Sequence, residues 1–410
     1  MPGLFNRSFL LLWQGQIVSQ LGNQAFLIAG TLFTLEQTGS ARMMSAVMAA
    51  SVIPIVLLAP LGGSFADRYS RRGLLVVTYA ARAVAIGGFG LYLLVGPEIG
   101  GSMVPVLIAV AFFGGAMSAV FVPTVQAFIP DLVPAARLGA ANSLNQLSMQ
   151  SAVLIGQASG GLLYASLGAA ALFLLDALGF AYAAVVTAML PRDRTAATGR
   201  ARWSDAIRAY AVEAAEAVRY IRSIRGMAPL ILIFTLVNFS FMPVFVLLPL
   251  YVRNVLGAGA QWYGFLLAAS GAGALAGSLI AAATVARGRR ASRLAAPCVA
   301  GIAMSVLLLA MTTQRFVAAT AFVIVGALAS IINVALITAF QQRSRSEMRG
   351  RVMALVVVLS TAATPVGMAA GGVMGDLWRD SLPLMFALCG SMLLLIAGAT
   401  IRIQDETRAE

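Results

Sequence analysis

Twelve stretches of about 20 mostly apolar residues follow one another along this chain. A stretch of that length crosses the hydrocarbon core of a bilayer as an α-helix, so it constrains the fold more than any motif does. Apolar residues make up 60% of the 410 residues and charged residues 10%, whereas about 25% charged residues is usual in soluble domains. The chain is therefore predicted to be an all-α integral membrane protein, with spans near 9–35, 43–66, 73–95, 102–128, 141–165, 168–190, 227–252, 261–285, 292–312, 316–341, 351–376 and 382–403.

The basic residues support this number of spans. The chain has no lysine and no histidine, so all 28 basic residues are arginines. With the N-terminus inside, 23 of them fall in inner loops and tails, four fall in outer loops, and Arg82 lies within the third span. Cytoplasmic loops carry the positive excess in membrane proteins. We therefore expect a multi-pass protein of the inner (plasma) membrane with both termini in the cytoplasm. The scattered arginines do not predict a nucleic-acid partner.

The composition also excludes several kinds of chemistry. Without histidine there is no imidazole metal site and no Ser-His-Asp hydrolysis, and without lysine there is no Schiff base. The two cysteines, Cys298 and Cys389, lie in apolar stretches, which favours a packing role. We expect neither a metal nor a cofactor, and a membrane-bound enzyme is only a remote alternative.

The two halves of the chain resemble each other. A shift of 211 residues, the distance from Gly115 to Gly326, superposes several glycines without gaps. Among them are two Gly-x-x-x-Gly-Gly patterns, one starting at Gly156 in the fifth span and one starting at Gly367 in the eleventh. Such patterns usually mark close helix packing, and their matched places make a sliding or hinging interface an alternative. Their repetition indicates an internal duplication.

A polar stretch at 191–226 separates the halves. Apolar residues spaced by three or four from Trp203 to Arg225 predict an amphipathic helix on the inner membrane surface. Its simplest role is that of a linker, and a regulatory or partner-binding role is the alternative. We therefore expect two pseudo-symmetric six-helix bundles at 1–190 and 227–410. Secondary transporters of this arrangement expose a site near the bilayer midplane to each side in turn.

The loop between the second and third spans carries a recognisable motif. It reads Gly63-Ser-Phe-Ala-Asp67-Arg68-Tyr-Ser-Arg71-Arg72 and resembles the loop signature of the major facilitator superfamily, Gly-x-x-x-Asp-Arg-x-Gly-Arg-Arg. The resemblance implies an inner gate, in which the Asp67 carboxylate pairs with arginines and with the N-terminal dipole of a helix from the other half. The arginines also suit the simpler role of fixing the topology.

The fifth span carries a second motif. Gly156-Gln157-Ala-Ser-Gly160-Gly161 is similar to the Gly-Pro-x-x-Gly-Gly motif of antiporters in this superfamily, with Gln157 in place of the proline that bends the helix. Nearly the whole chain resembles the branch that includes macrolide and siderophore exporters. The resemblance implies a monomeric efflux transporter, associated with multidrug resistance, that exports hydrophobic small molecules by proton antiport. An importer and a lipid or lysolipid carrier of the same fold are the alternatives.

The resemblance also implies that the first, fourth, seventh and tenth helices line the substrate cavity. Amides facing lipid are costly, so the amides on these helices face protein or water. They either contact substrate or hydrogen-bond between helices. A cavity lined by amides without a charge pair suits bulky, largely apolar solutes. The substrate candidates are Gln16, Gln20, Asn23, Gln126, Asn238 and Asn333.

Few acidic residues are placed to carry a proton. The candidates are Glu36 near the outer end of the first span, Asp131 at the inner end of the fourth, and Asp176 in the sixth. Asp176 lies deepest, and a carboxylate within the membrane is a functional hypothesis by default. Capping a helix or pairing with backbone is the alternative for Asp176. For Arg82 we expect snorkelling or a structural contact between helices.

Overall fold

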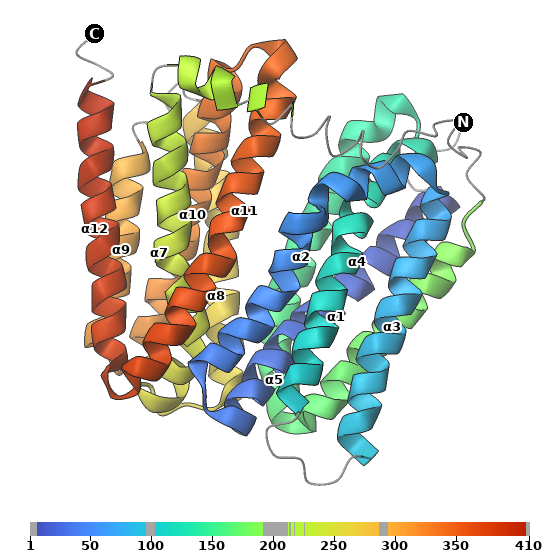
Figure 1. Ribbon diagram of the computed structural model, residues 1–410, viewed down its shortest axis with the longest axis horizontal. Helices are drawn as coiled ribbons and strands as arrows, with labels where there is room; N and C mark the ends of the chain where they lie inside the picture. The colour runs from blue at the N-terminus through green and yellow to red at the C-terminus, as the bar shows by residue number, and fades with distance from the viewer. Residues whose placement is uncertain are drawn as a thin grey trace. The chain divides into compact units, whose positions relative to one another are not determined.

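A computed structural model describes residues 6–95, 103–191, 226–286 and 294–406, with a few more between 212 and 224. In these residues the regular structure consists of α-helices and two short 3-10 turns, without a strand (Figure 1). The predicted all-α fold is confirmed. Nine of the described helices are long and apolar enough to cross a membrane.

The helices coincide with the predicted spans. In the first half they are α1 (Arg7–Thr38), α2 (Ala41–Arg68), α3 (Arg71–Val95), α4 (Met103–Leu132) and α5 (Leu138–Ala188). In the second half they are α7 (Met227–Asn254), α8 (Ala260–Ala286), α9 (Ala295–Met311), α10 (Arg315–Arg343), α11 (Ser346–Leu377) and α12 (Leu382–Glu406). The short turns η1 (Ala135–Arg137) and η3 (Arg379–Ser381) precede α5 and α12.

A single glycine divides α5 into the fifth and sixth spans. Gly168 has φ 77° and ψ 176°, a conformation open essentially to glycine alone, whereas the backbone is helical on both sides of it. The helix continues regularly through Gln157, where related motifs carry the bending proline. With α5 counted as two parts, a helical stretch stands at each of the twelve predicted spans.

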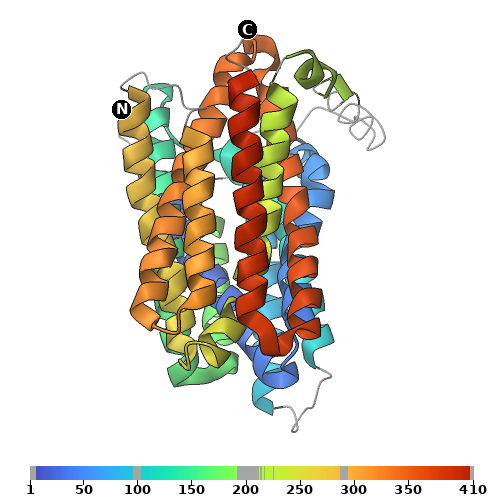
Figure 2. The ribbon, with the colours of Figure 1, turned by 90° about the vertical axis from the view of Figure 1, so that its left-hand side faces the viewer.

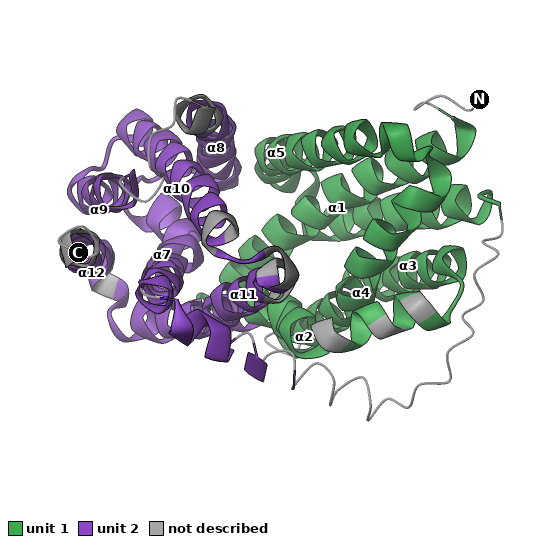
Figure 3. Ribbon diagram, turned by 90° about the horizontal axis from the view of Figure 1, so that it is seen from above, with its two compact units in different colours: residues 1–39, 47–208 green, residues 40–46, 209–410 purple. Residues whose placement is uncertain are grey.

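The chain forms two compact units. Unit 1 comprises residues 1–39 and 47–208, and unit 2 comprises residues 40–46 and 209–410 (Figure 3). The helix α2 therefore begins in unit 2 and continues in unit 1. Within unit 1, α5 packs along both α1 and α3, and α3 also packs against α4.

Unit 2 is built from three principal helix pairs. The helix α8 packs along α10, α9 along α12, and α7 along α11. The helix α12, drawn in red, also lies beside α7, drawn in yellow-green (Figure 2). The hydroxyl of Tyr251 on α7 donates to the carbonyl oxygens of Leu309 and Thr312, at 2.9 and 3.0 Å, and so joins α7 to the end of α9.

Matched glycines make matched contacts in the two units. A Cβ on Gly115 of α4 would run into the backbone oxygen of Ser51 on α2, and a Cβ on Gly326 of α10 would run into that of Ser270 on α8. These are the two glycines that the shift of 211 residues superposes. Each lets two backbones touch within its own unit, as small residues do in membrane helix pairs.

The two Gly-x-x-x-Gly-Gly patterns also pack alike. A Cβ on Gly156 of α5 would lie 2.7 Å from Cβ of Gln24 on α1. A Cβ on Gly367 of α11 would lie 2.8 Å from the backbone oxygen of Phe239 on α7, and one on Gly371 would lie 2.6 Å from Cα of Pro243. The first pattern thus packs α5 against α1, and the second packs α11 against α7; α1 and α7 are the first helices of the two halves of the chain.

The polar linker is described only at its end. Most of the predicted amphipathic helix from Trp203 to Arg225 lies outside the described residues. Residues 218–223 are helical, and the hydroxyl oxygen of Tyr220 accepts a 2.9 Å hydrogen bond from the backbone N–H of Arg345, which precedes α11. The end of the linker is therefore bound to the start of a spanning helix.

The break at Gly168 generates a stability prediction. Gly168→Ala forces a Cβ into a backbone conformation that costs about 1–3 kcal/mol, so the melting temperature in detergent should fall. Gly88→Ala on α3 is the matched control, because it adds a Cβ to a helical glycine with no atom within 4 Å. We expect the control to leave the melting temperature unchanged or slightly higher. Equal effects of the two substitutions would contradict a special role for Gly168.

Candidate functional site

A partly buried arginine joins four helical segments of unit 1. Arg82 on α3 donates from Nη2 to Oδ1 of Asn23 on α1 at 2.6 Å, and from Nη1 to Oγ of Ser118 on α4 at 3.2 Å. Its guanidinium carbon lies 4.1 Å from the ring centre of Phe180, in the second part of α5. A guanidinium within a membrane needs such partners because lipid offers none. The structural contact between helices expected for Arg82 is present.

Asp176 is fully buried near this arginine. Its side chain has 0% exposure, and neither carboxylate oxygen has a hydrogen-bond partner among the described residues. Arg82 is the charged group that acts on it electrostatically. The carboxylate also touches α1, because a Cβ on Gly22 would run into Oδ1 of Asp176. Gly22 precedes Asn23, so Arg82 and Asp176 meet adjacent residues of α1.

The other two acidic candidates have partners at helix ends. Glu36 is exposed near the end of α1, where Oε2 accepts a 2.6 Å hydrogen bond from the hydroxyl of Tyr164 on α5. Asp131, with its side chain 37% exposed, forms an ion pair of 2.6 Å with Arg71. Of the three candidates, Asp176 alone combines full burial with unpartnered oxygens in the described structure.

The predicted inner-gate motif lies at the end of α2 and the start of α3. Arg71 donates to the carbonyl oxygen of Ala127 on α4 at 2.9 Å as well as to Asp131, and Arg72 donates to the carbonyl oxygen of Ala188 at the end of α5. Both arginines thus satisfy the C-terminal ends of helices in their own unit. Gly63 and Arg68 lie on the last turns of α2, and the side chain of Asp67 is outside the described part of the structure.

The antiporter-like motif links α5 to α1 through amides as well as through glycines. Nε2 of Gln157 donates to Oε1 of Gln24 at 3.4 Å. Gly160 packs on Ile28, where a Cβ would lie 2.7 Å from Cδ1, and Gly161 is buried. An amide therefore stands at the helix contact where related motifs carry proline.

The predicted substrate residues have different environments. Gln16 is buried, with no partner for Nε2 among the described residues, whereas Gln20 is half-buried. Asn23 is held by Arg82, and Asn238 donates to the carbonyl oxygen of Phe234 on its own helix at 2.8 Å.

Two further candidates on α4 and α10, Gln126 and Asn333, are exposed on the surfaces of their own units. An exposed amide on a spanning helix is poorly solvated by lipid. These two side chains are therefore better placed than Asn238 to meet a solute.

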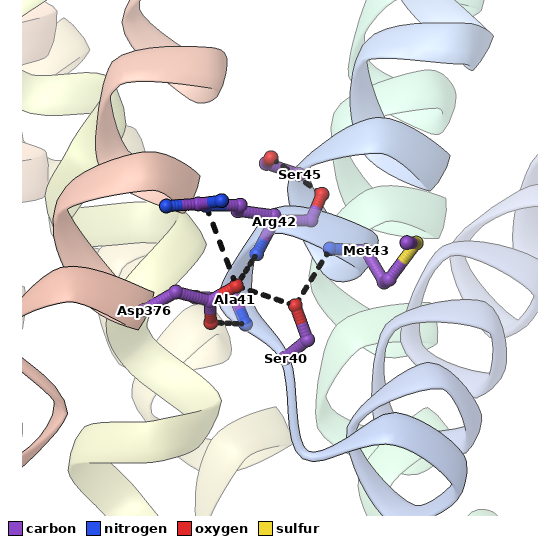
Figure 4. A network of polar contacts seen from close by, with 6 residues as sticks. All are labelled: Ser40, Ala41, Arg42, Met43, Ser45 and Asp376. Carbon is purple, nitrogen blue, oxygen red and sulfur yellow. Dashed lines mark hydrogen bonds and ion pairs between the residues drawn. The ribbon is translucent and has the colours of Figure 1, made fainter.

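One carboxylate that the sequence analysis did not single out lies at the end of α11. Asp376 accepts hydrogen bonds from Oγ of Ser40 and the backbone N–H of Ala41, both at 2.6 Å, and from the N–H of Arg42 at 3.4 Å (Figure 4). Nε of Arg42 lies 3.7 Å from Oδ2 of Asp376. The carboxylate therefore caps the N-terminus of α2, where the helix dipole and the unpaired N–H groups favour negative charge. The available signal was the aspartate ending one span together with the serine preceding another.

Comparison with known proteins agrees with this architecture. A family described as transmembrane secretion effector matches residues 2–409. Macrolide efflux protein A of Streptococcus pyogenes is 23% identical, with 95% of this chain and 94% of that protein covered. Multidrug efflux pump Tap of Mycobacterium tuberculosis is 25% identical, with 90% and 87% covered. A solved nucleoside transporter shares the fold with a TM-score of 0.79 at 11% identity, over 97% of this chain and 100% of that one.

The family match covers almost the entire chain, and the solved relative shares its helical fold from end to end. The predicted membership and the expectation of a transporter instead of an enzyme are both confirmed. The chain belongs to the transmembrane secretion effector family of the major facilitator superfamily, and it is a multi-pass membrane transporter.

Proposed function

We propose that this protein exports hydrophobic small molecules across the inner (plasma) membrane in exchange for protons, by alternating access, with both termini in the cytoplasm. The observation that carries the direction of transport is the match, over at least 90% of this chain, to proteins named for macrolide and multidrug efflux. Drugs, macrolides and siderophore-like metabolites form the proposed substrate class. A functional monomer is part of the proposal.

The chemistry of the exposed amides supports this substrate class. Gln126 and Asn333 offer neutral donors and acceptors, and α4 and α10 present mainly apolar side chains around them. Neutral amides orient a solute through hydrogen bonds, whereas apolar walls supply most of the binding free energy for a bulky, weakly polar molecule. Sugar phosphates and small anions need cationic partners, which neither helix offers near these residues.

The burial of Asp176 supports proton exchange at this residue. A carboxylate without hydrogen-bond partners in apolar surroundings costs several kcal/mol, and a bound proton removes that cost. A change in the position of α1, which the Asp176 carboxylate touches at Gly22, would open the site to water and favour release of the proton. Arg82 would then be the counter-charge for the ionised acid. The proton is therefore proposed to bind in the buried state and to leave in a hydrated one.

Transport in inverted membrane vesicles tests the proposed direction. When the lumen is acidified, an exporter that exchanges protons should concentrate a fluorescent hydrophobic dye or a macrolide inside these vesicles several-fold over vesicles without the protein. A protonophore should abolish the accumulation. Accumulation only in right-side-out vesicles would instead indicate an importer. Transfer of labelled lysolipid without any gradient would indicate a lipid carrier.

The substitution Asp176→Asn tests the proton site. The amide keeps the shape of the acid but carries no exchangeable charge, so dye transport driven by a pH gradient should fall about tenfold or more. Dye binding measured by fluorescence quenching should stay within about twofold, because Asp176 is buried between helices. The melting temperature should be retained, because a neutral side chain needs no counter-charge.

The two partnered acids provide the comparison. Asp131→Asn breaks the ion pair with Arg71, and Glu36→Gln weakens the bond from Tyr164. Both variants should keep their dependence on the pH gradient. Gradient-driven transport that survives Asp176→Asn and fails in one of these variants would move the proton site to that acid.

A further inference from the structure

The first turn of α2 is capped by a different helix. Four N–H groups at the start of any α-helix lack partners within it. Here Oγ of Ser40 accepts from the N–H of Met43 at 3.3 Å, and Asp376 of α11 accepts from the N–H groups of Ala41 and Arg42. The capping carboxylate comes from a residue 335 positions later than Ala41, so this part of the cap is present only while α11 is beside the start of α2.

Glycines of α11 bring the two helices into direct contact. A Cβ on Gly372 would run into the side chain of Ser45 and would lie 3.0 Å from the carbonyl oxygen of Ala41. A Cβ on Gly375 would lie 2.7 Å from Cβ of Ala41. Only one face of the first turn of α2 is buried: Ala41 and Met44 have 0% exposure, whereas Met43 is 43% exposed. The carboxylate of Asp376 and the surface of Gly372 and Gly375 together form one docking site for the first turn of α2.

The docked segment is short and belongs to a helix shared by both units. Residues 40–46 cluster with unit 2, whereas α2 from Val47 onward clusters with unit 1. The contacts described between this segment and α11 are hydrogen bonds to one carboxylate, its ion pair with Arg42, and packing on glycines. Water can replace the hydrogen bonds when the turn moves away.

We propose that Asp376 is a latch that holds the start of α2 on α11 in one transport state and releases it in the other. On the topology proposed above, both helix ends face the outside, so the latch would act on the outer side of the membrane. This inference rests on the proposed alternating access, although not on the identity of substrate or ion. The sequence motif placed a carboxylate latch at the inner end of α2, whereas the described latch is at its opposite end.

Thiol labelling at Met44 tests the latch. In a background of Cys298→Ser and Cys389→Ser, the reporter Met44→Cys should react slowly with a membrane-impermeant maleimide added outside, because the side chain is buried. Adding Asp376→Ala removes the cap and should raise the labelling rate on the order of tenfold by shifting the population toward the released state. Asp376→Asn, which keeps one acceptor oxygen and loses the charge, should give an intermediate rate.

Two controls separate a latch from other effects. Arg42→Gln leaves the backbone cap intact, and the arginine side chain is 51% exposed, so the rate at Met44→Cys should change less than about threefold. A second reporter, Leu309→Cys, is equally buried near the end of α9 and should label at the same rate with and without Asp376→Ala.

The outcomes decide the proposal without any transport assay. An unchanged rate at Met44→Cys in Asp376→Ala overturns the latch, and so does a parallel rise at Leu309→Cys, which would indicate general loosening of unit 2. A rise confined to Met44→Cys supports it. Because the measurement uses neither substrate nor proton gradient, failure of the exporter proposal in vesicles and failure of the latch are distinguishable.

Discussion

Lipid offers no hydrogen bonds, so every polar group on a spanning helix of this protein must find its partner in the protein itself. Hydroxyls solve the problem locally: Thr34, Thr124 and Ser240 each donate to the carbonyl oxygen four residues earlier. Arg82 cannot do so, and its guanidinium instead joins α1, α3 and α4. The carboxylate of Asp176, which has no hydrogen-bond partner in the described structure, is an exception to the rule, and we therefore propose it as the proton site.

Close backbone contacts join particular pairs of helices within each unit. Gly115 and Gly326 lock α2 to α4 and α8 to α10, and the paired glycine patterns seat α5 on α1 and α11 on α7. Interfaces in which a single added methyl group has no room do not slide easily, because close-packed interiors resist small displacements. The glycine patterns therefore favour rigid helix pairs within each unit.

The fold was largely predictable, because the length and the apolar composition of a span identify it in the sequence. Arginine placement predicts the alternation of inner and outer loops, and the shift of 211 residues indicates an internal duplication. The break in α5 was harder to predict, because Gly168 is one of 40 glycines and only its φ angle distinguishes it. The depth of Asp176 was visible in the sequence, whereas its missing partners depend on how four helical segments meet around Arg82.

The contacts of the loop motif and of Asp376 were not predictable in the same way. Arg71 and Arg72 lie in a recognisable motif, but the carbonyl oxygens they bind are set by where α4 and α5 end. Asp376 caps a helix far away in the sequence: the aspartate that ends one span and the serine that precedes another are visible locally, but the sequence does not show that they meet. Long-range pairs of this kind need coordinates.

The separation between Asp376 and Ala41 also has a consequence for biosynthesis. A ribosome makes the start of α2 long before it makes the carboxylate that caps it, 335 residues later. Until the eleventh span has entered the bilayer, that helix end depends on Ser40 and water for its N–H groups. Completion of the second span is thus coupled to one of the last insertion events. A nascent chain stalled before α11 would lack the Asp376 cap at the start of α2.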